Sequence, residues 1–360
     1  MKAFAHIGPG YVDWIDAPRP ALPQPYGVIL HPVAVAPCSS DVHTIDGGKG
    51  PKVENLIMGH ECVARVVEVA EKVRDFCPGD LVIVPAITPD WRAVAIQDRN
   101  YGHAEDHFAG HRLGRTWPGV FAEYFALPDA DTTLAHVPDW MTLEQALMCA
   151  DVMTTGLTGA ECASIKTGDV VCVMGIGPIG LMAIAGARSL GASRIIAVGS
   201  RRRCVELALH YGATDIADYH DGNVPERILE MTGQIGPDSV IIAGGGDEVF
   251  TQAVDMVRYG IGTISNVNYY GGDGGLMYPK FSGGRGMAGK SIHMELARGG
   301  RARMERMIAM VQYGRIDPAP LVTHKMIGWD ALPEAIELMR NKKSGTIKVM
   351  VCPSGEDRKG

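Results

Sequence analysis

Residues 170–180 read VVCVMGIGPIG, an apolar run followed by three glycines in the spacing G-x-G-x-x-G. The apolar run predicts a buried β-strand, and the small residues 181–190 predict a helix. In this context Gly175 permits a tight turn, Gly177 lets the backbone approach a pyrophosphate, and Gly180 lets the helix pack on the sheet. The helix start would offer its unpaired N–H groups to phosphate. The stretch therefore predicts a dinucleotide site, and the alternative is a glycine-rich loop without a ligand.

Strands and helices alternate on the C-terminal side of this stretch. The sequence predicts strands over 194–198, 215–217, 239–243 and 262–267, and helices over 205–211, 225–232 and 249–257. Such alternation is typical of βαβ units in a parallel sheet, so the fold class is α/β. The first 150 residues are instead β-rich, and Pro78-Gly79-Asp80 suggests a tight turn in a small barrel. Two further helices (301–312 and 332–340) and a closing strand (347–351) complete the prediction, and 90–118 is interpreted as a long loop.

The end of the second predicted strand indicates which dinucleotide binds. An NAD site usually places a carboxylate about 20 residues after the glycines, to hold the ribose 2′-OH. Here residues 198–203 read VGSRRR, with no carboxylate before Glu206. A hydroxyl from Ser200 and a cation from Arg201 suit a 2′-phosphate. The sequence predicts NADP(H), with Arg201 as its main partner, and a solvated basic turn is the alternative.

Three side chains suggest a metal site. Cys38, His60 and Asp151 offer a thiolate, an imidazole and a carboxylate, a set that suits Zn²⁺. Three ligands and one exchangeable position would make a catalytic site. From spacing alone, a structural histidine and a core cysteine are the commoner interpretation. The eight cysteines are dispersed without a C-x-x-C pair, so buried free thiols are the default expectation.

Composition excludes other classes. The net charge of −7 disfavours a nucleic-acid partner. No apolar run reaches about 18 residues, which argues against a membrane span. The N-terminal residues lack the pattern of a signal peptide, so we expect a cytoplasmic protein.

Several motifs together resemble the zinc-dependent medium-chain dehydrogenases, and more narrowly their NADP-dependent secondary alcohol dehydrogenases. They lie at 37–43, 59–61, 84–92, 151–156 and 175–182. The resemblance implies a GroES-like catalytic domain (1–152 and 296–360) and a doubly wound Rossmann domain (153–295). It implies reversible hydride transfer between NADP(H) and a secondary alcohol or ketone, in a homotetramer.

The resemblance also assigns roles to residues. Zinc would be held by Cys38, His60 and Asp151, with Glu61 able to coordinate, and Ser40 and His43 match the proton-relay positions. The cofactor-binding positions are Gly175, Ile176, Gly177, Pro178, Ile179, Gly180, Gly199, Ser200, Arg201, Tyr219, Asn268, Tyr269 and Lys342. The substrate-pocket positions are Ala86, Ile87, His111, Leu296 and Ala297.

Departures from the relatives' pattern refine these expectations. Some relatives carry a structural zinc on four close cysteines, but this chain has no cysteine between Cys77 and Cys149. One zinc per subunit is therefore expected. His111 stands where the subfamily usually has tryptophan, and Ala297 where cysteine is common. The hypothesis is a wider pocket for bulkier or more polar ketones, and the alternative is that other side chains refill the space.

Two other functions stay open: a zinc-free quinone or enoyl reductase of the same fold, and a non-enzymatic NADPH-binding protein. Three further features receive structural interpretations. His103, His107 and His111 are interpreted as solvated loop histidines. The arginines within 298–306 are interpreted as a solvated helix face. The glycines of 271–275 are interpreted as a flexible loop.

Overall fold

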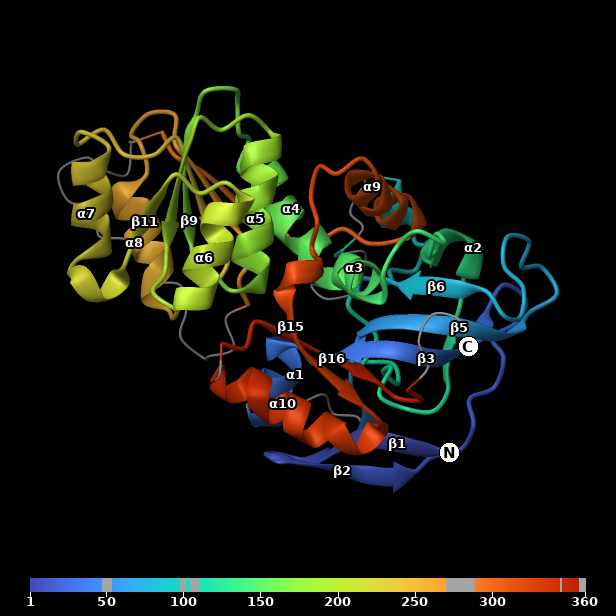
Figure 1. Ribbon diagram of the computed structural model, residues 1–360. Coiled ribbons are helices and arrows are strands. Elements are labelled where there is room, and N and C mark those ends of the chain that lie inside the picture. The colour runs from blue at the N-terminus through green and yellow to red at the C-terminus, as the bar shows by residue number, and fades with distance from the viewer. Residues whose placement is uncertain (47–53, 98–101, 104–109, 270–288, 344, 356–360) are drawn as a thin grey trace. The chain divides into compact units, whose positions relative to one another are not determined.

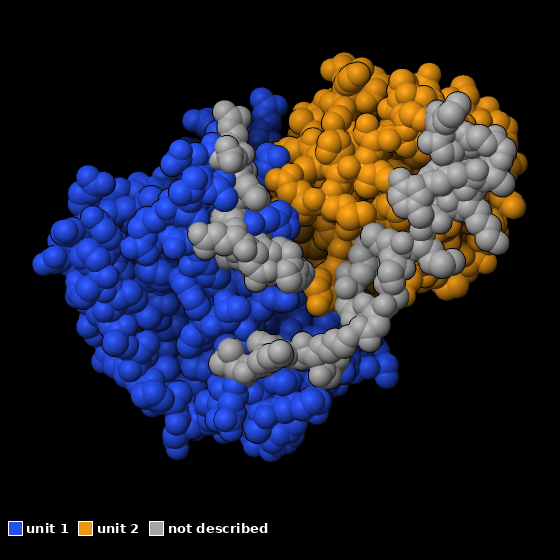
Figure 2. All heavy atoms as spheres, turned by 180° about the vertical axis from the view of Figure 1, so that it is seen from behind, with its two compact units in different colours: residues 1–154, 298–360 blue, residues 155–297 orange. Residues whose placement is uncertain are grey.

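The computed structural model describes residues 1–46, 54–97, 102–103, 110–269, 289–343 and 345–355. The chain divides into two compact units (Figure 2). The first unit comprises Met1–Thr154 and Arg298–Gly360, and the second comprises Thr155–Ala297. Among the described residues, none of the helices has the length and apolar character needed to cross a membrane. Two of the segments interpreted above, the loop 271–275 and the position of His107, lie outside the described residues.

The first unit is built on β-sheet. Its strands are β1 (Lys2–Gly8), β2 (Tyr11–Asp16), β3 (Val28–Ala36), β4 (Leu56–Ile57), β5 (Glu61–Val69), β6 (Leu81–Val84), β7 (Phe125–Leu127), β8 (Ala135–His136), β15 (Val322–Ile327) and β16 (Lys348–Cys352). Its helices are α1 (Ser39–Asp46), α2 (Ala130–Thr133), α3 (Leu143–Met148), α9 (Arg301–Gln312) and α10 (Leu332–Asn341), with a π-helix (Cys149–Met153) and short 3₁₀ turns (Val94–Ile96, Ala319–Leu321, Trp329–Ala331). In the described residues one sheet has the order β15-β16-β3-β5-β6-β8, with β7 paired to β3, and another has the order β2-β1-β4.

The strand β3 continues through a proline. Its two short apolar runs, 28–30 and 33–35, lie on either side of His31-Pro32, and Val28–Ala36 forms one strand whose pairing register with β5 shifts between Pro32 and Ala34. A proline has no N–H to donate, and such an irregularity accommodates it within a strand. Both faces of β3 are largely buried, and the strand ends two residues before Cys38, which is half-buried.

The second unit is a parallel sheet covered by helices. Its strands are β9 (Val170–Met174), β10 (Arg194–Val198), β11 (Asp215–Ala217), β12 (Ser239–Ile242), β13 (Thr263–Asn266) and β14 (Ser291–Met294). Its helices are α4 (Thr154–Cys162), α5 (Pro178–Ser189), α6 (Arg202–Tyr211), α7 (Val224–Met231) and α8 (Glu248–Met256), with a 3₁₀ turn at Tyr219–Asp221.

The order of these strands is β11-β10-β9-β12-β13-β14, and every pair is parallel. Helices α5 and α6 pack together on one face, and α7 and α8 on the other (Figure 1). The chain reverses its direction of winding between β9 and β12, where doubly wound sheets bind their ligands. The predicted fold class is confirmed.

Helix α9 corrects one expectation. The arginines of 298–306 were expected to form a solvated face, but Arg303 is buried, with only 7% of its surface exposed. The sequence shows only a row of charges, whereas Thr154, which accepts a hydrogen bond from the buried Arg303, lies 149 positions earlier in the chain. The default of a buried thiol is likewise wrong for Cys77, which is exposed.

Candidate metal centre and dinucleotide site

Four potential metal ligands meet in the first unit. The ligand atoms of Cys38, His60, Glu61 and Asp151 all lie within 4.8 Å of one another. Cys38 follows β3, His60 and Glu61 stand at the start of β5, and Asp151 belongs to the π-helix. Because β3 and β5 are antiparallel neighbours, the end of one meets the start of the other, and Ala36 pairs with Glu61. The topology thus joins ligands that are distant in the sequence.

A buried carboxylate orients two of these ligands. Asp41 is 2% exposed, and its Oδ2 accepts a hydrogen bond of 2.8 Å from the backbone N–H of Cys38. Its Oδ1 lies 3.5 Å from His60 Nδ1, which leaves Nε2 of that ring to face the cluster. The hydroxyl oxygen of Ser40 lies 3.3 Å from this Nε2. A carboxylate behind a ligating histidine fixes the ring and its tautomer.

Glu61 is paired with a buried lysine. Lys348 Nζ donates to Glu61 Oε1 at 2.5 Å and to the carbonyl of Pro37 at 3.1 Å. Lys348 is 1% exposed and Glu61 is fully buried. Within the described part of the chain, the second oxygen of Glu61, Oε2, has no hydrogen-bond partner. A buried carboxylate oxygen without a partner is costly, and a cation beside it removes that cost.

The electrostatics favour a thiolate at Cys38. Burial raises the pKa of Cys38, but the Lys348 ammonium and the hydrogen bond with His60 outweigh burial and lower it to about 7. Burial also works against a charged His60, but the Asp41 carboxylate holds the pKa of His60 well above its usual range. A metal ion therefore has to displace a proton from His60, and metal affinity falls as the pH falls.

The donor set fits zinc. One sulfur, one imidazole nitrogen and carboxylate oxygens are the ligands that Zn²⁺ takes at catalytic sites, and the orphaned oxygen of Glu61 adds a further donor. Cys38, His60 and Asp151 are the residues that would hold the ion.

The imidazole of His111 lies against the ring of His60, so its interpretation as a solvated loop histidine is wrong. Its ring centroid is 4.7 Å from that of His60, in an edge-to-face arrangement at 75°. Burial and the neighbouring charge of His60 lower the pKa of His111 to about 3, so the ring is neutral near pH 7.

The other predicted substrate-pocket positions lie in both units. Ala86 and Ile87 of the first unit are buried. In the second unit Ala297 is buried and Leu296 is half-buried.

The glycine stretch has the geometry that its spacing predicts. Gly175 has a φ of +84°, and a Cβ on Gly180 would lie 1.8 Å from the carbonyl oxygen of Gly175, so both positions require glycine. A Cβ on Gly177 would meet no described atom within 4 Å, which leaves the backbone open to a ligand. Helix α5 begins at Pro178, earlier than predicted, because proline is compatible with a first helical position.

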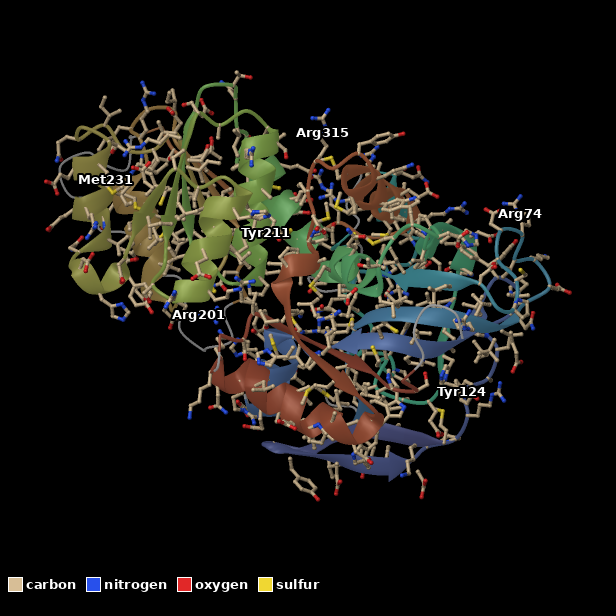
Figure 3. All side chains as sticks on the ribbon, in the orientation of Figure 1. Arg74, Tyr124, Arg201, Tyr211, Met231 and Arg315 are labelled. Atoms are coloured by element: carbon tan, nitrogen blue, oxygen red, sulfur yellow. The ribbon has the colours of Figure 1, made fainter. Side chains whose placement is uncertain are left out.

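The predicted 2′-phosphate residues lie at the ends of the next two strands. Gly199 and Ser200 follow β10, and Arg201 caps the start of α6, as Figure 3 shows. A Cβ on Gly199 would lie 2.2 Å from a side-chain carbon of Ile176, so a larger residue would disturb the glycine turn. Tyr219 follows β11 and is 51% exposed.

The remaining cofactor candidates lie in both units. In the second unit Asn268 follows β13, its side-chain amide donates to the carbonyl of Gly245 at 3.3 Å, and Tyr269 is exposed. Lys342, in the first unit, ends α10 in a left-handed conformation with a φ of 51°.

The sequence did not predict the roles of two buried residues that contact the metal ligands, Asp41 and Lys348. Asp41 lies within the motif 37–43, but its charge could have been read as a helix-start carboxylate. Lys348 interrupts the apolar run 347–351, and a lysine within a buried strand is an unusual choice that signals a buried partner.

The comparisons with known proteins agree with this geometry. Residues 24–139 match the family described as "Alcohol dehydrogenase GroES-like domain", and residues 178–312 match "Zinc-binding dehydrogenase". The chain is 49% identical to the NADP-dependent isopropanol dehydrogenase of Thermoanaerobacter brockii and 48% identical to that of Clostridium beijerinckii. Each match covers 98% of this chain and 99% of the relative.

A solved structure, the alcohol dehydrogenase TADH from Thermus sp. ATN1, superposes with a TM-score of 0.86. It is 28% identical, and the match covers 98% of this chain and 99% of that one. The predicted GroES-like and Rossmann fold is therefore confirmed, and the chain belongs to the zinc-binding alcohol dehydrogenase family.

Proposed function

We propose that this chain is a zinc-dependent, NADP(H)-dependent dehydrogenase that interconverts secondary alcohols and ketones. The observation that carries the proposal is the cluster of Cys38, His60, Glu61 and Asp151 in a chain 49% identical to an isopropanol dehydrogenase. The first unit, close to the predicted 1–152 and 296–360, acts as the catalytic domain. The second, close to 153–295, binds the cofactor.

The chain's own residues hold the metal ligands in place, orient the dinucleotide and move a proton. Bound zinc supplies a Lewis acid that lowers the pKa of an alcohol. Asp41 holds the ring of His60, and the charge of Lys348 favours the thiolate form of Cys38. Ser40 Oγ would accept the proton of the alcohol hydroxyl and release its own, and His43, which is exposed one turn further along α1, would pass a proton to solvent. The start of α5 and Arg201 orient the dinucleotide for hydride transfer.

The two other functions are less well supported. A zinc-free reductase of the same fold has no use for a thiolate, an imidazole and two carboxylates within 4.8 Å. A non-enzymatic NADPH-binding protein has no use for a buried Asp41 that orients two of those ligands.

Assembly and compartment are part of the proposal. We propose a homotetramer, and β14 supports self-association because, among the described strands, it lies at the edge of its sheet and all four of its residues, Ser291–Met294, are exposed. We propose a cytoplasmic location, since all eight cysteines are free, as expected in a reducing compartment. The partner is a small alcohol or ketone, and neither nucleic acid nor membrane is proposed as one.

A substrate panel tests the function and the size of the pocket. The zinc-loaded chain should oxidise propan-2-ol with NADP⁺ and should also reduce ketones with long or aromatic substituents, because the imidazole of His111 is smaller than an indole. The graded variants His111→Phe and His111→Trp should lose the bulky ketones by about 10-fold or more while retaining acetone, since overfilling a pocket costs about 1–3 kcal/mol. Initial rates with NADPH measure both effects. Turnover of acetone and butanone alone would reject the wide pocket, and no turnover of any ketone would reject the function.

Cofactor choice should depend on Arg201. The Arg201→Asp variant is expected to raise the KM for NADPH by about 10- to 100-fold, because a charge-assisted hydrogen bond to phosphate contributes about 1.5–3 kcal/mol. The control is Arg202→Asp, since the neighbouring Arg202 side chain is 94% exposed and pairs with Glu206. Steady-state KM values for NADPH and NADH in both variants provide the measurement. A native enzyme without a preference for NADPH would contradict the proposed 2′-phosphate site.

A further inference from the structure

A buried arginine on α9 donates hydrogen bonds to Thr154, the residue that follows the π-helix. Arg303 is 7% exposed, and its Nε donates to the hydroxyl oxygen of Thr154 at 2.8 Å. Its Nη2 donates to the carbonyl oxygen of Thr154 at 3.2 Å. The Thr154 hydroxyl in turn donates to the carbonyl of Arg298 at 2.7 Å. Side chain and backbone of Thr154 are thus both fixed from one helix.

Thr154 is hydrogen-bonded to the backbone of Asp151. The π-helix Cys149–Met153 ends at Thr154, whose N–H donates to the carbonyl of Asp151. On the other side of Asp151, the N–H of Ala86 donates to the carbonyl of Ala150 at 3.0 Å. The wider turn of a π-helix is rare and is frequently found at functional sites. Its aspartate is therefore held between two anchors outside the π-helix.

The hydrogen bonds between Arg303 and Thr154 differ from ordinary apolar packing. On the same helix, Met304 and Met307 are buried and fill space without any polar demand. A guanidinium at a buried position costs desolvation, but its rigid fork of donors fixes the direction of two acceptors at once. Thr154 supplies both acceptors.

We infer that Arg303 is a positioning residue that, through Thr154, holds Asp151 in the geometry of a metal ligand. The inference rests on the proposed zinc site. Partners that orient metal ligands typically change metal affinity by about 10- to 100-fold when they are removed. The Arg303→Gln variant should therefore weaken zinc binding by about that factor.

The test compares zinc dissociation constants of full-length chains by competition with a chromogenic chelator. The variants are Arg303→Gln, Asp151→Asn and their double variant, and the control is Arg306→Gln, because Arg306 is exposed on the same helix. If Arg303 acts through Asp151, Arg303→Gln weakens zinc binding in the native background and adds nothing in the Asp151→Asn background. The absorption spectrum of the Co²⁺-substituted chain should also change in Arg303→Gln and not in Arg306→Gln.

A second pair of variants covers the case in which Arg303→Gln does not fold. Thr154→Val removes the hydroxyl at nearly constant shape and should weaken zinc binding. Thr154→Ser keeps the hydroxyl and should bind zinc as tightly as the native chain. Unchanged zinc affinity in Arg303→Gln or Thr154→Val, or an equal loss with and without the Asp151 carboxylate, would overturn the inference alone. A native chain that binds no zinc would instead overturn the proposed function.

Discussion

The Cys38→Ser variant is expected to lose its zinc and at least about 10³-fold of kcat/KM for propan-2-ol, while binding of NADPH stays within about 2-fold of native. A metal acting as a Lewis acid contributes several kcal/mol to the barrier, and about 4 kcal/mol corresponds to 10³ in rate. Serine cannot replace the ligand, because its hydroxyl stays protonated where the Cys38 thiol, with a pKa of about 7, readily ionises. The dinucleotide turn Gly175–Gly180 lies in the second unit and is not altered.

The measurements are zinc content, NADPH binding by fluorescence and turnover. Cys77→Ser is the control, since Cys77 is exposed and hydrogen-bonded to Asp80, outside the metal cluster. Chelation of the native chain should reproduce the loss, and added Zn²⁺ should reverse it. A Cys38→Ser chain that kept both stoichiometric zinc and turnover would show that the thiolate is not a ligand, and the proposed reaction would need another centre.

The dinucleotide turn could be predicted from the sequence because its constraints are local. A positive φ at Gly175 and the 1.8 Å that a Cβ on Gly180 would leave to the Gly175 carbonyl both arise within six consecutive residues. The glycine spacing, in its context between a strand and a helix, therefore predicts this part of the structure. Strands β9 to β13 and helices α5 to α8 of the second unit lie within about three residues of their predicted ranges, whereas α4 and β14 have no predicted counterpart. The metal ligands were recognised through residue type and resemblance, not through spacing.

The supporting residues could not be predicted, because their meaning depends on partners far away in the chain. Lys348 meets Glu61 across 287 positions, and Arg303 meets Thr154 across 149. In a sequence each is a single charge, one in a strand and one in a basic helix. Only the topology, which places β16 beside β3 and packs α9 against the π-helix, shows that they are buried and paired.

The Lys348→Met variant is expected to lower the free energy of unfolding by about 3–5 kcal/mol, because it leaves Glu61 buried without its counter-charge. Urea unfolding of the zinc-free chain measures this change. Lys325→Met is the matched control on the neighbouring strand β15. Its side chain is 61% exposed and pairs with Glu144, so the expected loss is about 0–1 kcal/mol.

The double variant Glu61→Gln with Lys348→Met separates the pair from the packing around it. Removing both charges should restore most of the stability that Lys348→Met loses, since no uncompensated charge then stays buried. The charge of Lys348 is also one of the causes that lower the pKa of Cys38, together with His60, so the single variant should raise that pKa, which the pH dependence of thiol alkylation reports. A double variant as unstable as Lys348→Met would mean that the lysine acts through its packing, and an unchanged Cys38 pKa would separate Lys348 from the thiolate.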